Sequence, residues 1–147
     1  MSGTTVIPSR RKLRIILVED EKTLAELLEF CIRQWFQEIE VLPFEDGDAA
    51  WRELSRTEPD LLITDFYHPG MNGGMLISKL AEKRVKYPVL FTTAEATLSP
   101  DFAALGIKVL LLPKPFLLEP LWQALHELVG PCDFPVDHLD SSKFRTH

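Results

Sequence analysis

The sequence predicts an α/β fold, a doubly wound five-stranded parallel sheet with helices on both faces. Five short apolar runs alternate along the chain with segments whose apolar residues recur at helical spacing. The length, 147 residues, is that of one domain with a real hydrophobic core. In parallel sheets of this kind, the carboxyl ends of the strands meet at one edge, where ligands bind.

The first strand is expected at residues 13–18, an apolar run rich in β-branched residues that ends on Glu19 and Asp20. The next segment is expected to be a helix, because its apolar residues form one face at intervals of three and four. These residues are Leu24, Leu27, Leu28, Cys31, Ile32 and Trp35.

A short second strand is expected at residues 40–44, and Pro43 predicts an edge position for it. A second helix then ends before Pro59, and its apolar residues are expected to face the sheet. The third strand, residues 61–65, is an apolar run that ends on Asp65, and a loop rich in Pro and Gly follows it.

The third helix is expected to contain Met75, Leu76 and Leu80 and to end near residues 87–88. The fourth strand, residues 89–93, ends on the hydroxyl residue Thr93. These two elements continue the alternation of helix and strand that the fold requires.

A short helix is expected from Ser99 to about Gly106, because Ser, Pro and Asp favour a helix start. The fifth strand, residues 107–112, is followed directly by Lys114. The last helix is expected to carry Pro120 in its first turn and to stop at Gly130.

Three parts of the chain are expected: a flexible arm at residues 1–12, the folded domain at 13–130 and a tail at 131–147. We expect a cytoplasmic protein without membrane insertion, because no signal peptide and no membrane-length apolar run is present. Cys31 and Cys132 show neither metal-site nor disulfide spacing. A net charge of -6 argues against direct nucleic-acid binding.

Polar residues stand at the ends of four of the five predicted strands. Asp65 alone would be an ordinary turn residue. The other strand ends favour a functional site, because they place three acids, one hydroxyl and one ammonium at the same edge. The five residues of this candidate site are Glu19, Asp20, Asp65, Thr93 and Lys114.

This set of side chains predicts phosphoryl transfer to Asp65. Three crowded carboxylates stay ionised only when a cation shares their site, and oxygen ligands suit Mg²⁺. Lys114 and Thr93 are suited to bind phosphoryl oxygens. A carboxylate nucleophile is already deprotonated, so the reaction needs no general base.

The chain resembles the receiver domain of two-component response regulators over about residues 12–130. The resemblance implies the CheY-like, flavodoxin-like fold with strand order 2-1-3-4-5. Each motif is weak alone, but together, in order and at family-like separations, they are specific. The motifs lie at residues 16–21, 64–73, 88–94 and 112–116.

The resemblance implies a role for each site residue. Asp65 would accept a phosphoryl group from a phosphohistidine on a histidine kinase or a phosphotransfer protein. Glu19, Asp20, Asp65 and the backbone carbonyl of Tyr67 would hold Mg²⁺. The hydroxyl of the fourth strand and the lysine after the fifth would bind the phosphoryl group. These last two residues are Thr93 and Lys114, and the Lys114–Pro115 bond would be cis.

One departure from the family affects how a signal would travel. The family often has Tyr or Phe where this chain has Leu111, and that aromatic ring swings inward on activation. A leucine predicts that the signal takes another route.

The function expected from these features is that of a stand-alone receiver that signals by changed protein–protein contacts to a downstream protein. It would not be an enzyme beyond Mg²⁺-assisted self-phosphorylation and slow dephosphorylation. A phosphorelay intermediate, a pseudo-receiver scaffold and a metal-dependent phosphatase are the alternatives, and a homodimer is left open. The complete site argues against the scaffold. Tyr67 argues against the phosphatase, because aspartyl phosphatases commonly have a second Asp at that place.

Overall fold

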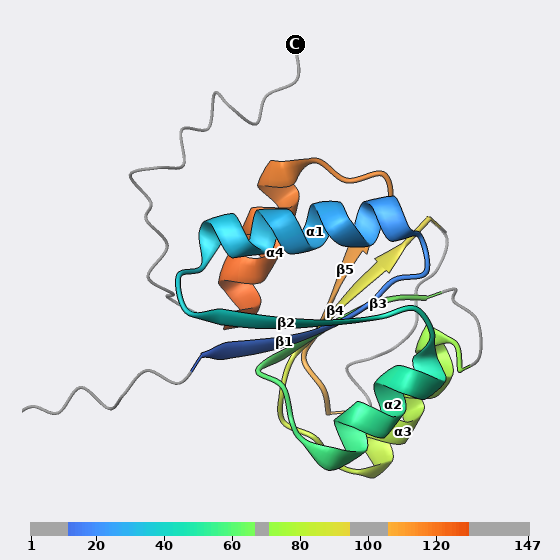
Figure 1. Cartoon of the computed structure of the whole chain (residues 1–147). Helices are drawn as coiled ribbons and strands as arrows, with labels where there is room; N and C mark the ends of the chain where they lie inside the picture. The colour runs from blue at the N-terminus through green and yellow to red at the C-terminus, as the bar shows by residue number, and fades with distance from the viewer. Residues whose placement is uncertain (1–11, 67–70, 95–105, 130–147) are drawn as a thin grey trace, which may run out of the picture.

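The computed structural model describes residues 12–66, 71–94 and 106–129. It contains a five-stranded parallel sheet in the order β2-β1-β3-β4-β5, as the sequence predicts (Figure 1). The strands are β1 (Leu13–Val18), β2 (Ile39–Phe44), β3 (Leu61–Asp65), β4 (Val89–Thr93) and β5 (Val109–Pro113). The helices are α1 (Lys22–Trp35), α2 (Gly47–Arg56), α3 (Gly73–Glu82) and α4 (Leu118–Val129).

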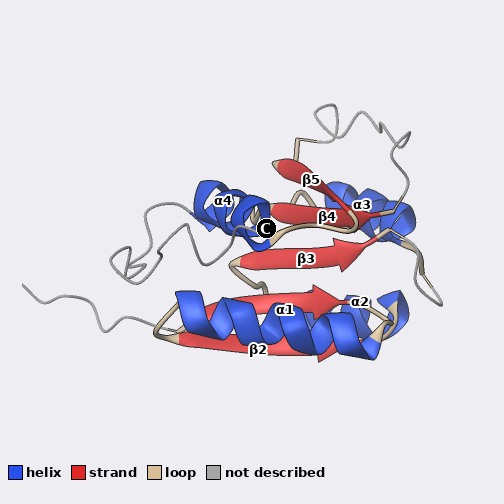
Figure 2. Cartoon of the chain, turned by 90° about the horizontal axis from the view of Figure 1, so that it is seen from above, coloured by secondary structure: helices blue, strands red, loops and turns tan. Residues whose placement is uncertain are grey.

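The helices cover both faces of the sheet, α1 and α4 on one and α2 and α3 on the other (Figures 1 and 2). Strand β1 shows why, because its residues are apolar at successive positions and therefore point to both sides. Ile15 and Leu17 pack in the core beneath α1 and α4. Ile16 and Val18 pack in the core beneath α2 and α3. Each face of the sheet thus has its own hydrophobic core.

Most predicted bounds are confirmed to within one residue, and two differ by more. Helix α3 ends at Glu82 rather than near residues 87–88. Arg84 adopts a left-handed φ of 56°. The Val85 N–H then donates to Leu80 O, a bond that closes the helix. Strand β5 starts at Val109 rather than at residue 107.

Two local predictions that involve proline are confirmed. Pro43 is exposed on β2, which forms one edge of the sheet. The Lys114–Pro115 peptide bond is cis. The helix predicted at residues 99–106 and both terminal segments lie outside the described residues, apart from Lys12 and Gly106.

Helix α2 begins with a capped turn, in which the Asp46 side chain accepts a hydrogen bond from the Ala49 N–H at 2.8 Å. We expect Asp46→Ala to lower the free energy of unfolding by about 1 kcal/mol, because one N-terminal N–H loses its acceptor. Urea denaturation measures this. Ser55→Ala, an exposed change on the same helix, is the control and should change the value by less than about 0.5 kcal/mol.

Candidate functional site

The described site residues lie at the carboxyl edge of the sheet. They are close to β1 and β3, the two neighbouring strands between which the strand order reverses. Strand β1 lies between β2 and β3, so the chain leaves the ends of β1 and β3 in opposite directions, which is where ligands bind in sheets of this kind. Val18 pairs with Thr64, which places the following residues, Glu19 and Asp65, side by side. Thr93 pairs with Pro113, which brings Lys114 to the same edge.

Lys114 connects the two buried acids. Its Nζ lies 2.8 Å from Glu19 Oε1 and 2.9 Å from Asp65 Oδ2. Glu19 is 2% exposed and Asp65 is 7% exposed, so both carboxylates have lost most of their contact with water. The Lys114 ammonium therefore offsets the repulsion between the two carboxylates, which is strong because little water surrounds them.

The backbone supports Glu19 from its other side. The N–H of Glu21 donates a hydrogen bond to Glu19 Oε2 at 3.1 Å, so both oxygens of this carboxylate have donors. Burial nevertheless raises the pKa of Glu19 above its ordinary value, and the neighbouring charge of Asp65 adds to the rise. Lys114 and the Glu21 N–H only partly offset it.

The pKa of Lys114 is also shifted. Burial by itself lowers this pKa, but hydrogen bonds to Glu19 and Asp65 and their negative charges raise it. The net direction is upward. Lys114 therefore stays charged at neutral pH, although its side chain is only 17% exposed.

Three carboxylates meet at this edge with the spacing of a metal site. Glu19, Asp20 and Asp65 each offer an oxygen, and these oxygens lie within 4.8 Å of one another. Asp20 is exposed, so the cluster opens to solvent. An all-oxygen donor set with an open side fits Mg²⁺, which keeps several waters. Tyr67, whose carbonyl was predicted as a further ligand, lies outside the described residues.

Thr93 is placed at the end of β4 and is 1% exposed. Its backbone carbonyl accepts a hydrogen bond from the Lys114 N–H at 2.6 Å. The hydroxyl residue and the lysine of the site are thus joined through the main chain.

Two supporting contacts have no signature in the sequence. The hydrogen bond from the Glu21 N–H to Glu19 depends on the turn between β1 and α1. The Thr64 hydroxyl donates to the carbonyl of Asp65 at 3.0 Å and fixes the backbone where the strand ends. The motif at residues 16–21 includes Glu21, but it does not indicate that the backbone N–H of Glu21 binds the Glu19 carboxylate.

Comparisons with known proteins give a consistent result. The model of the response regulator receiver domain family matches residues 15–126. The transcriptional regulatory protein TrcR of Mycobacterium tuberculosis is 29% identical over 118 residues, which are 80% of this chain and 45% of that protein. The sensory transduction protein RegX3 of the same species is 35% identical over 80 residues, 54% of this chain and 34% of that protein.

Among solved structures, the receiver domain of a sensor histidine kinase from Pseudomonas aeruginosa PAO1 superposes with a TM-score of 0.69. It is 24% identical, the match covers 82% of this chain and 99% of that one, and its active-site cleft coordinates a magnesium ion. The chain covers less than half the length of the two curated relatives. No helix in the described part of the chain is long and apolar enough to cross a membrane.

Proposed function

Because the chain belongs to the response regulator receiver domain family, we propose that it accepts a phosphoryl group on Asp65 and signals through changed protein contacts. The observation that carries this proposal is the position of Lys114, whose ammonium bridges Glu19 and Asp65 next to the exposed Asp20. A carboxylate nucleophile, a cation and further oxygen ligands are the groups that phosphoryl transfer to a protein requires.

The transfer itself needs little covalent chemistry from the protein. An oxygen of the Asp65 carboxylate forms a bond to phosphorus while the bond from phosphorus to the donor's histidine nitrogen breaks. Lys114 keeps its positive charge beside the reacting oxygen and stabilises the charge that the phosphoryl oxygens carry. Thr93, at the end of the neighbouring strand, is proposed to donate its hydroxyl to the transferred group.

The carboxylates of this edge are proposed to hold Mg²⁺. The ligands would be Glu19, Asp20 and Asp65, with the carbonyl of Tyr67 as a further ligand. When bound, this ion supplies positive charge that neutralises the phosphoryl oxygens and orients them. The magnesium ion in the Pseudomonas aeruginosa receiver domain supports this assignment.

The proposed partners are a histidine kinase or a phosphotransfer protein as donor and a protein as the downstream target. We propose a cytoplasmic signalling role without enzymatic turnover of a substrate, beyond the slow loss of the phosphoryl group. The stand-alone role and its phosphorelay alternative stay predictions, and so does a homodimer.

The test is phosphorylation by a small donor. Wild-type protein incubated with acetyl phosphate and Mg²⁺ should gain the mass of one phosphoryl group, measured on the intact chain, and peptide mapping should place it on Asp65. The same incubation with EDTA should give no adduct, because the carboxylates then lack their cation. A protein that gains no phosphoryl group in Mg²⁺ would contradict the proposed function. An equal gain in EDTA would contradict its metal dependence.

A further inference from the structure

A basic surface lies on the outer side of α2 and α3, the two helices that cover one face of the sheet (Figure 1). Residues 73–88, which include α3, contain four basic residues and a single acid, Glu82, whereas the whole chain has a net charge of -6. Three of the four basic residues are exposed and one is half-buried. They are Lys79, Lys83, Arg84 and Lys86.

Trp51 of α2 brings two of these charges to one place. The Nζ of Lys79 lies 5.4 Å from the centroid of the Trp51 ring, and the Nζ of Lys83 lies 5.3 Å from the same centroid. Both are cation–π distances. The two lysines are also four residues apart on α3, a spacing at which like charges on a helix repel each other.

No carboxylate offsets this repulsion within the part of the chain that the structure describes. Other basic residues there are paired, as Arg14 is with Glu53 and Lys114 is with Asp65. The four basic residues of residues 73–88 form no such ion pair with the described residues. Their charge is therefore available to a partner molecule.

The stability of α3 explains only part of this pattern. Lys79 and Lys83 lie at the carboxyl end of the helix, where positive charge is favourable against the helix dipole. Arg84 and Lys86 lie beyond the last turn, where that effect has fallen off. Arg84 also has a φ of 56°, a conformation in which glycine would carry less strain. The chain thus bears an exposed charge at a position where its backbone favours a residue without a side chain.

Apolar surface accompanies the charge. Met75 lies one turn before Lys79 on the same side of α3 and is 52% exposed. The Trp51 ring is half-buried under the two ammonium groups. Methionine adapts its shape to different apolar partners. The surface therefore suits a ligand that combines negative charge with an apolar side chain.

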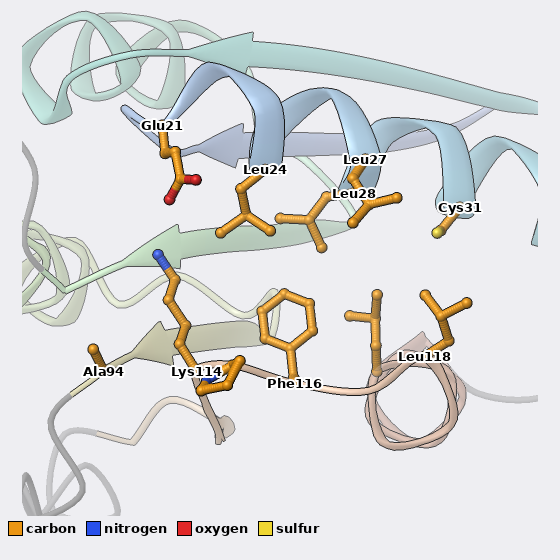
Figure 3. Close-up of a pocket in the computed structure, with 11 residues that line it drawn as sticks. Glu21, Leu24, Leu27, Leu28, Cys31, Ala94, Lys114, Phe116 and Leu118 are labelled. Atoms are coloured by element: carbon orange, nitrogen blue, oxygen red, sulfur yellow. The ribbon is translucent and has the colours of Figure 1, made fainter. Parts of the chain in front are cut away.

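The basic residues are remote from the carboxyl edge of the sheet. Helix α3 joins the parallel neighbours β3 and β4, so the chain returns along it to the amino edge, and Lys86 lies just before β4 begins at Val89. Strand β4 has five residues and spans roughly 16 Å between the two edges. The apolar pocket beside Lys114 lies between α1 and Phe116, on the other face of the sheet (Figure 3). A molecule bound near Lys86 therefore leaves the carboxyl edge open.

The charge of the whole chain favours an acidic protein segment over a larger polyanion. A membrane surface or a nucleic acid presents negative charge over a wide area, and the rest of this chain, with its net charge of -6, would repel it. A short acidic segment contacts the basic residues alone. Its apolar side chain can then lie against Met75 and the edge of Trp51.

We propose that this α2–α3 surface docks a short acidic segment of a partner protein, and that the segment also carries an exposed leucine or phenylalanine. The surface consists of Trp51, Met75, Lys79, Lys83, Arg84 and Lys86. Docking is independent of the state of Asp65, because the basic residues and the site lie at opposite edges of the sheet. It keeps a partner attached while the carboxyl edge stays accessible.

Binding is measured by the fluorescence anisotropy of a labelled synthetic peptide in which one central leucine is flanked by aspartate and glutamate. A second peptide has lysine at every acidic position. The acidic peptide should bind saturably to the full chain and more weakly as salt is added, and the lysine peptide should not bind. No saturable binding of the acidic peptide, or equal binding of both, would overturn the proposal and would leave the proposed function untouched.

Two triple variants with the same net charge locate the surface. One changes three lysines of the surface to glutamine, and the other changes three exposed lysines elsewhere. The first should weaken binding of the acidic peptide by about tenfold or more, and the second should stay within about twofold of the wild type. An equal loss in both would mean that only net charge matters, against the proposal. The variants are Lys79→Gln/Lys83→Gln/Lys86→Gln and Lys12→Gln/Lys22→Gln/Lys108→Gln.

Amide NMR spectra of the wild-type chain test the location without any substitution. On titration with the acidic peptide, the largest shifts should fall on the indole N–H of Trp51 and on the amides of Lys83 and Arg84. Larger shifts at Asp20 or Lys114 would place the peptide at the carboxyl edge and would contradict the docking surface.

The apolar part of the surface is tested by Met75→Gln, which should weaken binding by about threefold. The matched control is Leu117→Gln, because Leu117 is 54% exposed and Met75 is 52% exposed. Leu117→Gln should bind like the wild type. Equal effects of the two changes would remove Met75 from the surface.

Two further measurements test the independence from Asp65 and the class of partner. Protein treated with acetyl phosphate and Mg²⁺ should bind the acidic peptide within about twofold of untreated protein, and a change of more than about fivefold would contradict independence. Phosphatidylserine vesicles and a single-stranded oligonucleotide should displace the labelled peptide less well than the unlabelled peptide does. If either displaces it better, the assigned partner class is wrong.

Discussion

Asp65→Asn is expected to abolish the phosphoryl adduct that acetyl phosphate forms with the wild-type chain. The amide is a far weaker nucleophile than the carboxylate, and no other described acid is bonded to Lys114 at the open edge except the buried Glu19. Intact mass after incubation with Mg²⁺ measures the loss. We expect no adduct above background over a time in which the wild type is fully converted.

The same variant should remain folded, which separates chemistry from stability. Asparagine removes one of three neighbouring negative charges, and Lys114 keeps its ion pair with Glu19 at 2.8 Å. The free energy of unfolding in urea should therefore stay within about 1 kcal/mol of the wild type. Asp48→Asn, an exposed acid on α2, is the matched control and should form the full adduct. A residual adduct on Asp65→Asn would show that another residue accepts the group.

The sequence predicts the sheet closely because its central strands are buried on both sides. Runs such as residues 61–65 and 89–93 begin with three apolar residues, are buried at every position and are flanked by turn residues, so their ends are sharply marked. The alternation with helices then determines which ends share an edge. For this reason the sequence predicts that the lysine after β5 lies beside the acids at the ends of β1 and β3, as it does in the structure.

What the sequence does not predict depends on local conformation and on packing between distant segments. The end of α3 at Glu82 requires a left-handed Arg84, and that conformation is uncommon for a residue with a side chain. Phe116, just after Lys114, lines a pocket together with Leu24 and Leu28 of α1, more than 80 residues away in sequence. Cys31 is predicted to lie on the apolar face of the first helix, and it is buried there, but the sequence does not show that it lines a pocket with Phe116.

Lys114→Met is the second change expected to have a large effect, and it should slow phosphorylation by acetyl phosphate on the order of 100-fold or more. Methionine preserves much of the apolar stem of the lysine side chain but removes the ammonium from Glu19 and Asp65. The developing charge on the phosphoryl oxygens then loses its fixed cation. The initial rate of adduct formation, measured by intact mass at one Mg²⁺ concentration, gives the effect.

The matched control is Lys108→Met, because Lys108 is an exposed lysine whose Nζ donates a hydrogen bond to the backbone carbonyl of Glu127 at 3.5 Å and, among the described residues, forms no hydrogen bond or ion pair with the site. Its rate should stay within about twofold of the wild type, since a surface charge remote from the site is screened by salt. Loss of rate in Lys114→Met with an unchanged unfolding midpoint would assign the effect to charge at the reacting oxygens. A Lys114→Met rate within threefold of the wild type would mean that the metal alone supplies the charge, and Lys114 would then serve only to join the two buried acids.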